Sequence, residues 1–304
     1  MNKRAAGMRT VLVSALLLLF PIIGLSADPD LSIYYTASLN GNLIGCQCRG
    51  VPKAGLSTTA AYLRSLDPSR SILLDLGDFS DARVDELLSG KLLELYSDLG
   101  YSASALGDQE LGSGLDYFKK SAEDFNFLCN NIKIEGRSLS NGPMIIEKQR
   151  IKIGIAAVID PAVFFFYPDD VKSRIEISDP AEAASEALAE LKAAGSSYNI
   201  LLFHGHAEEA RAVFDTETGW DAVLFAHDQM LFDEKTDNRI FASPGEEGNR
   251  VGRLDLFFRF RKLSKAENSM RYFKYEADPE DPEVLQVFED YKKELIENLK
   301  NGKK

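Results

Sequence analysis

The stretch SILLDLGD, residues 71–78, decides the predicted fold. It is a short run of aliphatic residues that ends in a Gly-Asp turn, which is typical of a strand buried inside a sheet. The stretch LSIYYTA at 31–37 has the same character, and the segment GLSTTAAYLRSL at 55–66, which lies between them, has helical character. A strand, a helix and a second strand in this order indicate an α/β fold.

The rest of the chain continues this alternation and then changes to strands alone. Helices are expected at 84–100 and at 179–195, the second with Asp179 as its cap. The other predicted elements are strands at 101–108, 198–206 and 220–229, a helix at 115–125, a hairpin at 143–160, strands at 238–245, 250–262 and 269–277, and a last helix at 282–299. An alternating region followed by an antiparallel region predicts two sheets flanked by helices. No composition break marks a second domain, so we expect one domain at 28–278 and a C-terminal helix at 279–304.

The first residues have the pattern of a secretory signal peptide. Three basic residues accompany an apolar run at 11–25, and Ala27 precedes a polar start. The run is shorter than the roughly 20 apolar residues of a membrane span, and Pro21 interrupts it. We therefore expect a signal peptide at 1–27 and an extracytoplasmic location, periplasmic or secreted, with no stable membrane span after cleavage. An uncleaved anchor is the alternative.

The composition is that of a folded, acidic protein. Hydrophobic residues make up 45% and charged residues 27% of the chain, and the formal net charge is −12, or −15 once the three basic residues of the signal are removed. So acidic a body repels phosphate backbones, which argues against a nucleic-acid partner. A small phosphorylated molecule remains possible if a metal ion or local donors offset the charge.

Metal-ligating side chains follow several of the predicted strands. Asp78 and Asp108 come after two of them, and the three histidines of the chain, at 204, 206 and 227, lie at the ends of two others. Ligands of open α/β sheets bind outside the carboxyl ends of the strands. Carboxylate oxygen and imidazole nitrogen suit one divalent ion, Zn, Mn or Fe. Solvation of the strand ends is the alternative explanation.

The order of these motifs resembles that of the calcineurin-like metallophosphoesterases, in their bacterial 5′-nucleotidase (UshA-like) branch. That branch reads D-x-H-G, G-D, G-N-H-E, a strand-end His and G-H-x-H. The corresponding segments here are SLNG (38–41), LDLGD (74–78), LGDQE (106–110), LLFHGH (201–206) and FAHDQ (225–229). The resemblance covers roughly residues 31–260 and implies a four-layer fold, a two-sheet metallophosphoesterase sandwich flanked by helices.

The resemblance also separates the two metal positions of the family. One aspartate, here Asp78, is shared between the two metals. The first metal would further require the D-x-H pair and the last histidine, but this chain has Ser38, Asn40 and Gln229 there. The second metal would find competent ligands in Asp108, His204 and His227 beside Asp78. The resemblance therefore implies one retained metal site and one degenerate site.

The catalytic positions of the family have changed as well. The histidine that acts as a positioned acid corresponds to Gln109, and the acid that orients it corresponds to Gly112. A glutamine side chain donates a hydrogen bond to an oxyanion but does not transfer a proton near neutral pH. Larger members append a C-terminal domain that stacks the nucleobase, and the roughly 45 residues after Phe260 are too few for such a domain.

Two cysteines stand beside the degenerate site. Cys46 and Cys48 resemble a Cys-x-Cys subgroup of UshA-like proteins and selenoproteins. Such a pair could bind a soft metal, form a readily reduced disulfide, act as nucleophile and resolver, or form a structural disulfide that holds the loop. Arg49 and Lys53 would lower the pKa of a nearby thiol. Cys129 stands alone, and we expect it to be a small buried hydrophobic residue.

Four consecutive aromatic residues, 164–167, form a second unusual segment. Packing of this loop against the core is the first interpretation, and a lid or docking patch is the second. For function, three hypotheses follow from the sequence: a one-metal hydrolase of a phosphoester, a thiol/disulfide redox protein that uses Cys46 and Cys48 with a redox partner, and a non-catalytic binding protein.

Overall fold

A computed structural model describes residues 28–46, 53–123, 125–245 and 247–302. The predicted signal peptide at 1–27 and Cys48 lie outside these residues. Within the described ranges, no helix is both long and apolar enough to cross a membrane.

Two six-stranded sheets form the body of the described structure. The first has the order β15-β14-β1-β2-β3-β4, with β1 Leu31–Thr36, β2 Ser71–Asp75, β3 Ala103–Ala105, β4 Phe127–Leu128, β14 Arg250–Arg259 and β15 Lys262–Tyr272. The second has the order β12-β13-β11-β10-β8-β7, with β7 Met144–Lys148, β8 Ile151–Ile159, β10 Tyr198–Gly205, β11 Ala222–His227, β12 Leu231–Thr236 and β13 Arg239–Pro244. A third, small sheet contains β5 Ile132–Ile134, β6 Arg137–Ser138 and β9 Ile175–Ile177.

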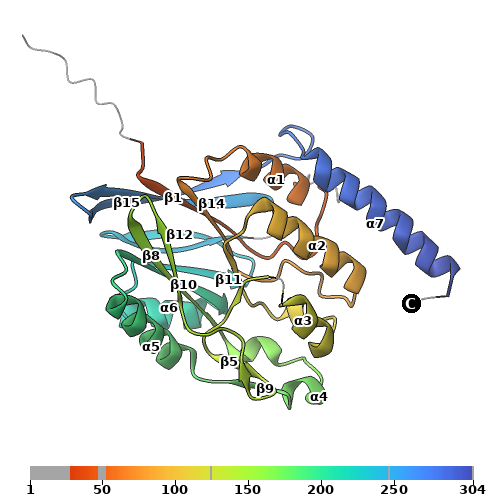
Figure 1. The fold of residues 1–304 in the computed structure, drawn as a ribbon, viewed down its shortest axis with the longest axis horizontal. Coiled ribbons are helices and arrows are strands. Elements are labelled where there is room, and N and C mark those ends of the chain that lie inside the picture. The colour runs from red at the N-terminus through yellow and green to blue at the C-terminus, as the bar shows by residue number, and fades with distance from the viewer. Residues whose placement is uncertain (1–27, 47–52, 124, 246, 303–304) are drawn as a thin grey trace, which may run out of the picture.

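Helices cover the outer faces of both large sheets (Figure 1). They are α1 Leu56–Arg64, α2 Glu86–Leu99, α3 Leu115–Ser121, α4 Asp169–Lys172, α5 Pro180–Ala193, α6 Ala207–Thr216 and α7 Pro282–Lys300, with the short 3₁₀ helices η2 Gln109–Leu111 and η3 Pro161–Phe164. Helices α1, α2 and α7 lie on the side of the first sheet, and α5 and α6 lie on the side of the second. The result is the predicted sandwich of two sheets between helices.

The alternation of side chains along each strand divides the core into layers. In β1, Ile33 and Tyr35 belong to the apolar cluster between the two sheets, whereas Tyr34 belongs to the cluster beneath the helices of the first sheet. A third cluster joins the outer face of the second sheet to α5 and α6, with Trp220 fully buried in it. The central strands of both sheets, such as β1, β2, β10 and β11, are therefore buried on both faces, which explains the continuous hydrophobic runs in the sequence.

Most predicted elements are present, with boundaries that follow local chemistry. Helix α5 begins after Asp179, whose carboxylate accepts from the backbone N–H groups of Ala181 and Glu182. The strand predicted at 71–78 ends earlier, at Asp75, because Gly77 and Asp78 have φ angles of 93° and 59° that leave the extended conformation.

The end of the second antiparallel strand differs in a similar way. The sequence predicts a strand through residue 262, but β14 ends at Arg259 and β15 begins at Lys262. Phe260 and Arg261, with φ angles of 52° and 65°, make the tight turn between the two strands.

Candidate metal centre

Residues at or just after the ends of four strands lie together at one end of the sandwich. Asp78 and Asp108 follow β2 and β3 of the first sheet, while His204 lies near the end of β10 and His227 at the end of β11 of the second sheet. Ligand atoms of these four residues all lie within 4.8 Å of one another. The two sheets thus bring together, at the carboxyl ends of their parallel strands, the four residues that the sequence selected as candidate ligands.

The distances between these atoms fit a small divalent ion. His204 Nε2 lies 3.4 Å from Asp78 Oδ1 and 3.4 Å from Asp108 Oδ1. His227 Nδ1 lies 3.2 Å from Asp108 Oδ1 and 3.8 Å from Asp78 Oδ2. Two ligands of a tetrahedral ion with bonds near 2.0–2.1 Å stand about 3.3 Å apart. The donor set of two carboxylates and two imidazoles therefore suits Zn, Mn or Fe in both chemistry and spacing.

His204 is held in the orientation that a ligand requires. The residue is fully buried, and its Nδ1 lies 2.8 Å from the backbone carbonyl oxygen of Leu76. A carbonyl only accepts, so Nδ1 carries a proton and Nε2 faces Asp78 and Asp108, from where it could bind an ion once it is deprotonated. His227 Nδ1 is also buried, and the oxygens nearest to it are those of the carboxylates of Asp108 and Asp78.

The charges at the site favour a cation. Burial opposes a charge on His204, but the nearby carboxylates of Asp78 and Asp108 outweigh it and raise its pKa to about 9. Hydrogen bonding to Asp108 and Asp78 raises the pKa of His227 to about 10. The pKa of Asp108 falls to about 2, against the effect of burial, because both histidines hydrogen-bond to it. Two carboxylates thus draw positive charge onto both imidazoles, and a divalent ion would supply that charge instead.

A buried carboxylate, Glu110, organises the loops that carry the two aspartates. Its oxygens accept from the backbone N–H groups of Gly107 (2.8 Å), Asp78 (3.0 Å) and Ser80 (3.1 Å). Burial and the charge of Asp78 raise its pKa to about 8. At Gly107 an added Cβ would lie 2.4 Å from atoms of Asp78, so only glycine permits this approach. The sequence alone does not indicate this role of Glu110, although the residue follows Asp108 by only two positions.

The three positions that the resemblance implies for a second metal have an unusual backbone conformation. Ser38, Asn40 and Gln229 have φ angles of 45°, 52° and 56°, in the left-handed region that is uncommon for residues other than glycine. Asp78 and His227 share this feature, with φ angles of 59° and 108°. Backbone strain of this kind clusters at functional sites.

Gln109 lies between the two sets of positions. Its backbone N–H donates to Asp78 Oδ1 (3.2 Å), and its side-chain Nε2 donates to Asn40 Oδ1 (3.0 Å). Its Oε1 is buried and has no partner among the described residues, as is the case for Ser38 Oγ. The structure therefore brings the predicted catalytic residue Gln109 next to the candidate ligands.

The predicted cysteine pair is only half described. Cys46 is disulfide-bonded, and its backbone forms an isolated bridge with Lys53. Lys53 Nζ forms an ion pair with Glu247 at 2.6 Å. Cys48 lies outside the described residues. Cys129 is buried, as predicted, and burial raises the pKa of its thiol to about 12.

A second pair, His206 and Asp228, was not selected from the sequence. His206 Nδ1 lies 2.8 Å from Asp228 Oδ1, and Asp228 Oδ2 accepts from the backbone N–H of Ala207 at the start of α6. Together with His227 these residues form a further group with the spacing of metal ligands. The strand-end motifs His-Gly-His and His-Asp contain both residues, but the resemblance requires only one histidine of the first motif, His204.

A cavity of about 670 Å³ opens beside the four candidate ligands. Asp108, Gln109, His206 and His227 line one part of it, and residues 162–168 line another. The first interpretation of the aromatic segment, packing against the core, is wrong for half of it. Phe164 is buried, whereas 73% of Phe165 and 92% of Phe166 is exposed, because η3 turns these two side chains outward.

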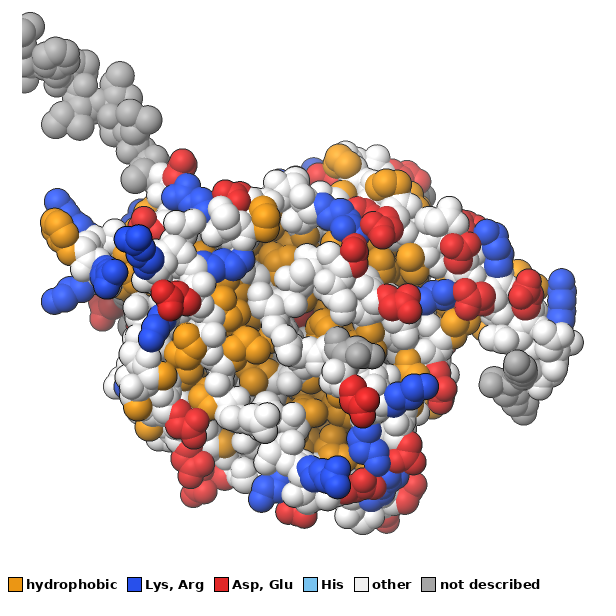
Figure 2. All heavy atoms as spheres, viewed as in Figure 1, with side chains coloured by type: hydrophobic (Ala, Val, Ile, Leu, Met, Phe, Trp, Pro, Cys, Tyr) orange, Lys and Arg blue, Asp and Glu red, His pale blue; other side chains and the backbone are white. Residues whose placement is uncertain are grey.

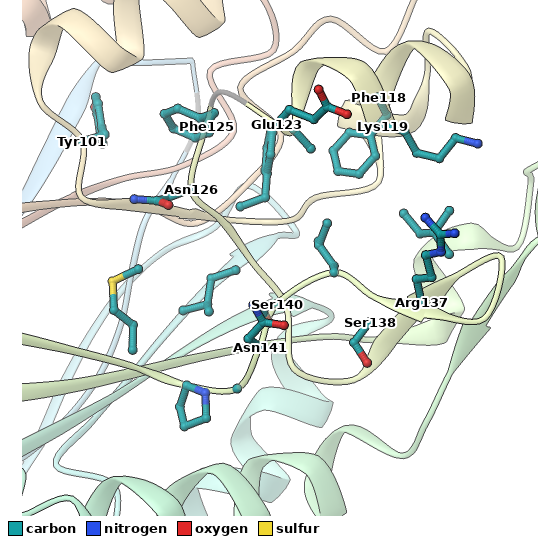
Figure 3. Close-up of a pocket in the computed structure, with 18 of the residues that line it drawn as sticks. Tyr101, Phe118, Lys119, Glu123, Phe125, Asn126, Arg137, Ser138, Ser140 and Asn141 are labelled. Carbon is teal, nitrogen blue, oxygen red and sulfur yellow. The ribbon is translucent and has the colours of Figure 1, made fainter.

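A larger cavity, of about 1200 Å³, lies away from the candidate ligands, between β4 and the start of β7 (Figure 3). On the face of the molecule that Figure 2 shows, hydrophobic side chains lie over the middle and charged side chains lie around the edge. The charged residues that line the cavity include Lys119 and Glu135, which pair with each other at 2.8 Å. Its lining includes none of the chain's three histidines, so we place the candidate site at the smaller cavity.

Comparisons with known proteins agree with this architecture. No protein-family model matches the chain. It is similar to the trifunctional nucleotide phosphoesterase protein YfkN of Bacillus subtilis (25% identity over 81% of this chain and 20% of the relative) and to a 2′,3′-cyclic-nucleotide 2′-phosphodiesterase/3′-nucleotidase of Yersinia enterocolitica (23% identity, 81% and 45%). It is also similar to the endonuclease YhcR of Bacillus subtilis (23% identity, 65% and 19%). The chain thus spans from about a fifth to less than half of the length of these relatives.

Solved structures show the same fold. A 5′-nucleotidase precursor from Thermus thermophilus superimposes with a TM-score of 0.76 at 18% identity, over 88% of this chain and 59% of that one. The calcineurin-like phosphoesterase YfkN from Bacillus subtilis superimposes with a TM-score of 0.74 at 21% identity, over 90% and 100%. The described residues therefore have the fold of the calcineurin-like phosphoesterases and 5′-nucleotidases.

Proposed function

We propose that this protein is a metal-dependent phosphoric ester hydrolase that works with one divalent ion, held by Asp78, Asp108, His204 and His227. The observation that carries the proposal is the convergence of two carboxylates and two imidazoles at distances of 3.2 to 3.8 Å. The names of the relatives support a phosphoester as substrate, since they describe nucleotide phosphoesterases and an endonuclease. An extracytoplasmic location, with residues 1–27 as a signal peptide, is part of the proposal.

When bound, the ion would supply Lewis acidity at a phosphoryl oxygen. The protein would contribute the orientation of His204, through its bond to the Leu76 carbonyl, and the rigid placement of Asp78, through Glu110. Gln109 is the third contribution. Its amide uses one hydrogen on Asn40, and the second can donate to a phosphoryl oxygen without transferring a proton.

The acidic body of the protein bears on the substrate class. A net charge of −12 disfavours polyanions, which makes a small phosphorylated molecule the preferred substrate. One relative is named an endonuclease, so nucleic acid is a competing substrate class that the experiment includes.

The test is metal analysis of the purified full chain, followed by hydrolysis assays with added Mn²⁺ or Zn²⁺. Substrates would be p-nitrophenyl phosphate, its bis-ester, nucleoside 2′,3′-cyclic phosphates and single-stranded DNA. We expect one ion per chain and hydrolysis of a small ester that His227→Asn lowers at least 100-fold. Asp169→Asn, at a fully exposed side chain, serves as the control and should leave the rate unchanged. One bound ion without turnover of any of these substrates would make the protein a binding protein, and no bound ion would refute the proposal.

A further inference from the structure

The cavity beside the candidate metal centre is lined in part by small residues, which leave room for a ligand. Gly112, where the orienting acid is expected, lines the cavity together with the small side chains of Ala82 and Ala162. Gly112 has φ and ψ angles of −59° and −35°, an ordinary helical conformation that any residue adopts. The φ angle therefore does not require glycine. An added Cβ would, however, lie 3.0 Å from the backbone carbonyl oxygen of Gln109, so a larger residue would crowd η2 as well as reduce the cavity.

Two exposed phenylalanines stand at this cavity. The rings of Phe165 and Phe166 have centroids 4.9 Å apart and planes at 87°, so that they form a right-angled corner. Phe165 is 73% exposed and Phe166 is 92% exposed, so neither ring packs in the core. A planar ring bound in such a corner can stack on one phenylalanine and meet the edge of the other, the two arrangements that aromatic rings prefer.

The residues before and after Phe165 and Phe166 are fixed by hydrogen bonds and by packing. Before them, Asp160 caps η3 by accepting from the backbone N–H of Ala162 (2.9 Å), and Phe164 is buried. After them, the Tyr167 hydroxyl donates to the backbone carbonyl of Asp108 (2.5 Å). This bond ties the aromatic loop to a residue that also supplies a candidate metal ligand. A corner ordered in advance loses little freedom when a ligand binds.

We infer that Phe165 and Phe166 bind an aromatic ring of the substrate, so that the preferred ligand is a phosphoester or phosphonate that carries an aryl or heteroaryl group. The inference rests on the proposed function, because the phosphoryl group would lie at the end of the cavity lined by Asp108 and His227. One cavity then offers a cation-binding end and an aromatic end, which match the two parts of such a molecule. The loop at 161–168 would supply within this domain a contact for the ring.

The test compares two ligands that differ only in the ring, phenylphosphonate and methylphosphonate, neither of which is hydrolysed. Their affinities for the full chain with added Mn²⁺ are measured by isothermal titration calorimetry. Stacking of one ring on an aromatic side chain is worth enough for about a tenfold difference. We expect phenylphosphonate to bind about tenfold more tightly, and the double variant Phe165→Ala/Phe166→Ala to bring the ratio of the two affinities close to one.

Phe260→Ala is the matched control, because this residue is also 92% exposed but lies in the turn between β14 and β15. It should keep the tenfold ratio. Equal affinities of the two phosphonates for the unchanged protein would overturn the inference and leave the proposed function standing. A ratio that survives the double variant, or falls equally in the control, would also overturn it. If neither phosphonate binds the metal-loaded protein, both the inference and the proposed function fail.

Discussion

The four candidate ligands differ from the three positions at which the resemblance implies a second ion. The first set, Asp78, Asp108, His204 and His227, has carboxylate and imidazole groups, whereas the second, Ser38, Asn40 and Gln229, has only neutral side chains. Residues of both sets nevertheless share left-handed φ angles, from 45° to 108°. The comparison shows that this backbone conformation does not depend on the presence of metal-ligating side chains.

Hydrogen bonds between the loops explain this conformation. The backbone N–H groups of Ser38 and Asn40 donate to the carbonyls of Gly77 and Asp78, each at 2.9 Å. The carbonyl of Ser38 in turn accepts from the N–H of Glu247 at 2.7 Å. The loop that contains Ser38 and Asn40 is thus fixed by hydrogen bonds to residues 77, 78 and 247, and it does not need an ion to keep its conformation.

The largest effect is expected from Asp78, which the resemblance assigns to both metals. Asp78→Asn should weaken binding of the single ion at least 100-fold, more than the loss of an outer-shell partner costs, because a charged ligand becomes neutral. Asparagine tolerates the left-handed φ of this position, so the fold should be kept. Competition with a chelating dye measures the affinity, and Asp169→Asn is the control. Unchanged affinity would remove Asp78 from the ligand set.

The comparison can also be reversed by restoring the missing ligands. Ser38→Asp/Asn40→His/Gln229→His should raise the metal content from one ion to two per chain, since the backbone is already in place. Without metal the variant should be less stable than the parent, because a carboxylate is buried at Ser38. Elemental analysis after gel filtration counts the ions. Adding Asp78→Asn should abolish tight binding at both positions, and a count that stays at one would show that more than the ligands has been lost.

Asp75, a buried residue at the end of β2, should make the stability of the protein depend on pH. Burial raises the pKa of Asp75 to about 6, although Thr36, Ser104 and the Gly77 N–H hydrogen-bond to it. The folded state thus binds the proton more tightly than the unfolded state. The contribution of Asp75 to stability should therefore be complete below about pH 4 and be lost, at a cost of about 3 kcal/mol, as the pH rises through about 6.

Urea unfolding at several pH values measures this slope. Asp75→Asn, which is neutral throughout, should make the loss of stability between about pH 4 and pH 6 smaller by about 3 kcal/mol, while the exposed Asp169→Asn should leave the slope unchanged. Glu110, whose pKa is raised to about 8, should still contribute a slope in the Asp75→Asn variant. Identical slopes in the parent and in Asp75→Asn would show that Asp75 does not contribute.

The smallest effect concerns the bond from Tyr167 to the Asp108 carbonyl. Tyr167→Phe should cost about 1 kcal/mol of stability, the typical contribution of one hydrogen bond. Tyr117→Phe is the matched control, since it also loses a hydroxyl bond to a backbone carbonyl, that of Glu86. Only the Tyr167 variant should also weaken metal binding, by two- to threefold, because it loosens Asp108. Equal metal affinities in the two variants would show that the hydrogen bond of Tyr167 does not contribute to metal binding.

The sequence predicted the layers and the four candidate ligands for one physical reason. Apolar runs that end in polar residues mark buried strands, and the ends of parallel strands meet at one edge, so Asp78, Asp108, His204 and His227 could be expected together. The pairing of His206 with Asp228 could not be derived, because it depends on the rotamers of residues on adjacent strands. Four consecutive aromatic residues cannot all face inward in a short loop, but that Phe165 and Phe166 are the exposed ones could not be derived, because the conformation of residues 161–166 decides which rings face outward.

The capping of three amide groups by Glu110 has a consequence for the choice of ion. One carboxylate holds the loops after β2 and β3 together, so Asp78 and Asp108 cannot move apart independently. A cage of fixed width selects by ionic radius. Calcium, which needs six to eight oxygens at about 2.3 to 2.6 Å, would have to spread these loops, whereas a smaller transition-metal ion would not. Glu110 would therefore bind no ion itself, but by fixing the distance between the loops that carry Asp78 and Asp108 it would determine which ionic radius fits the site.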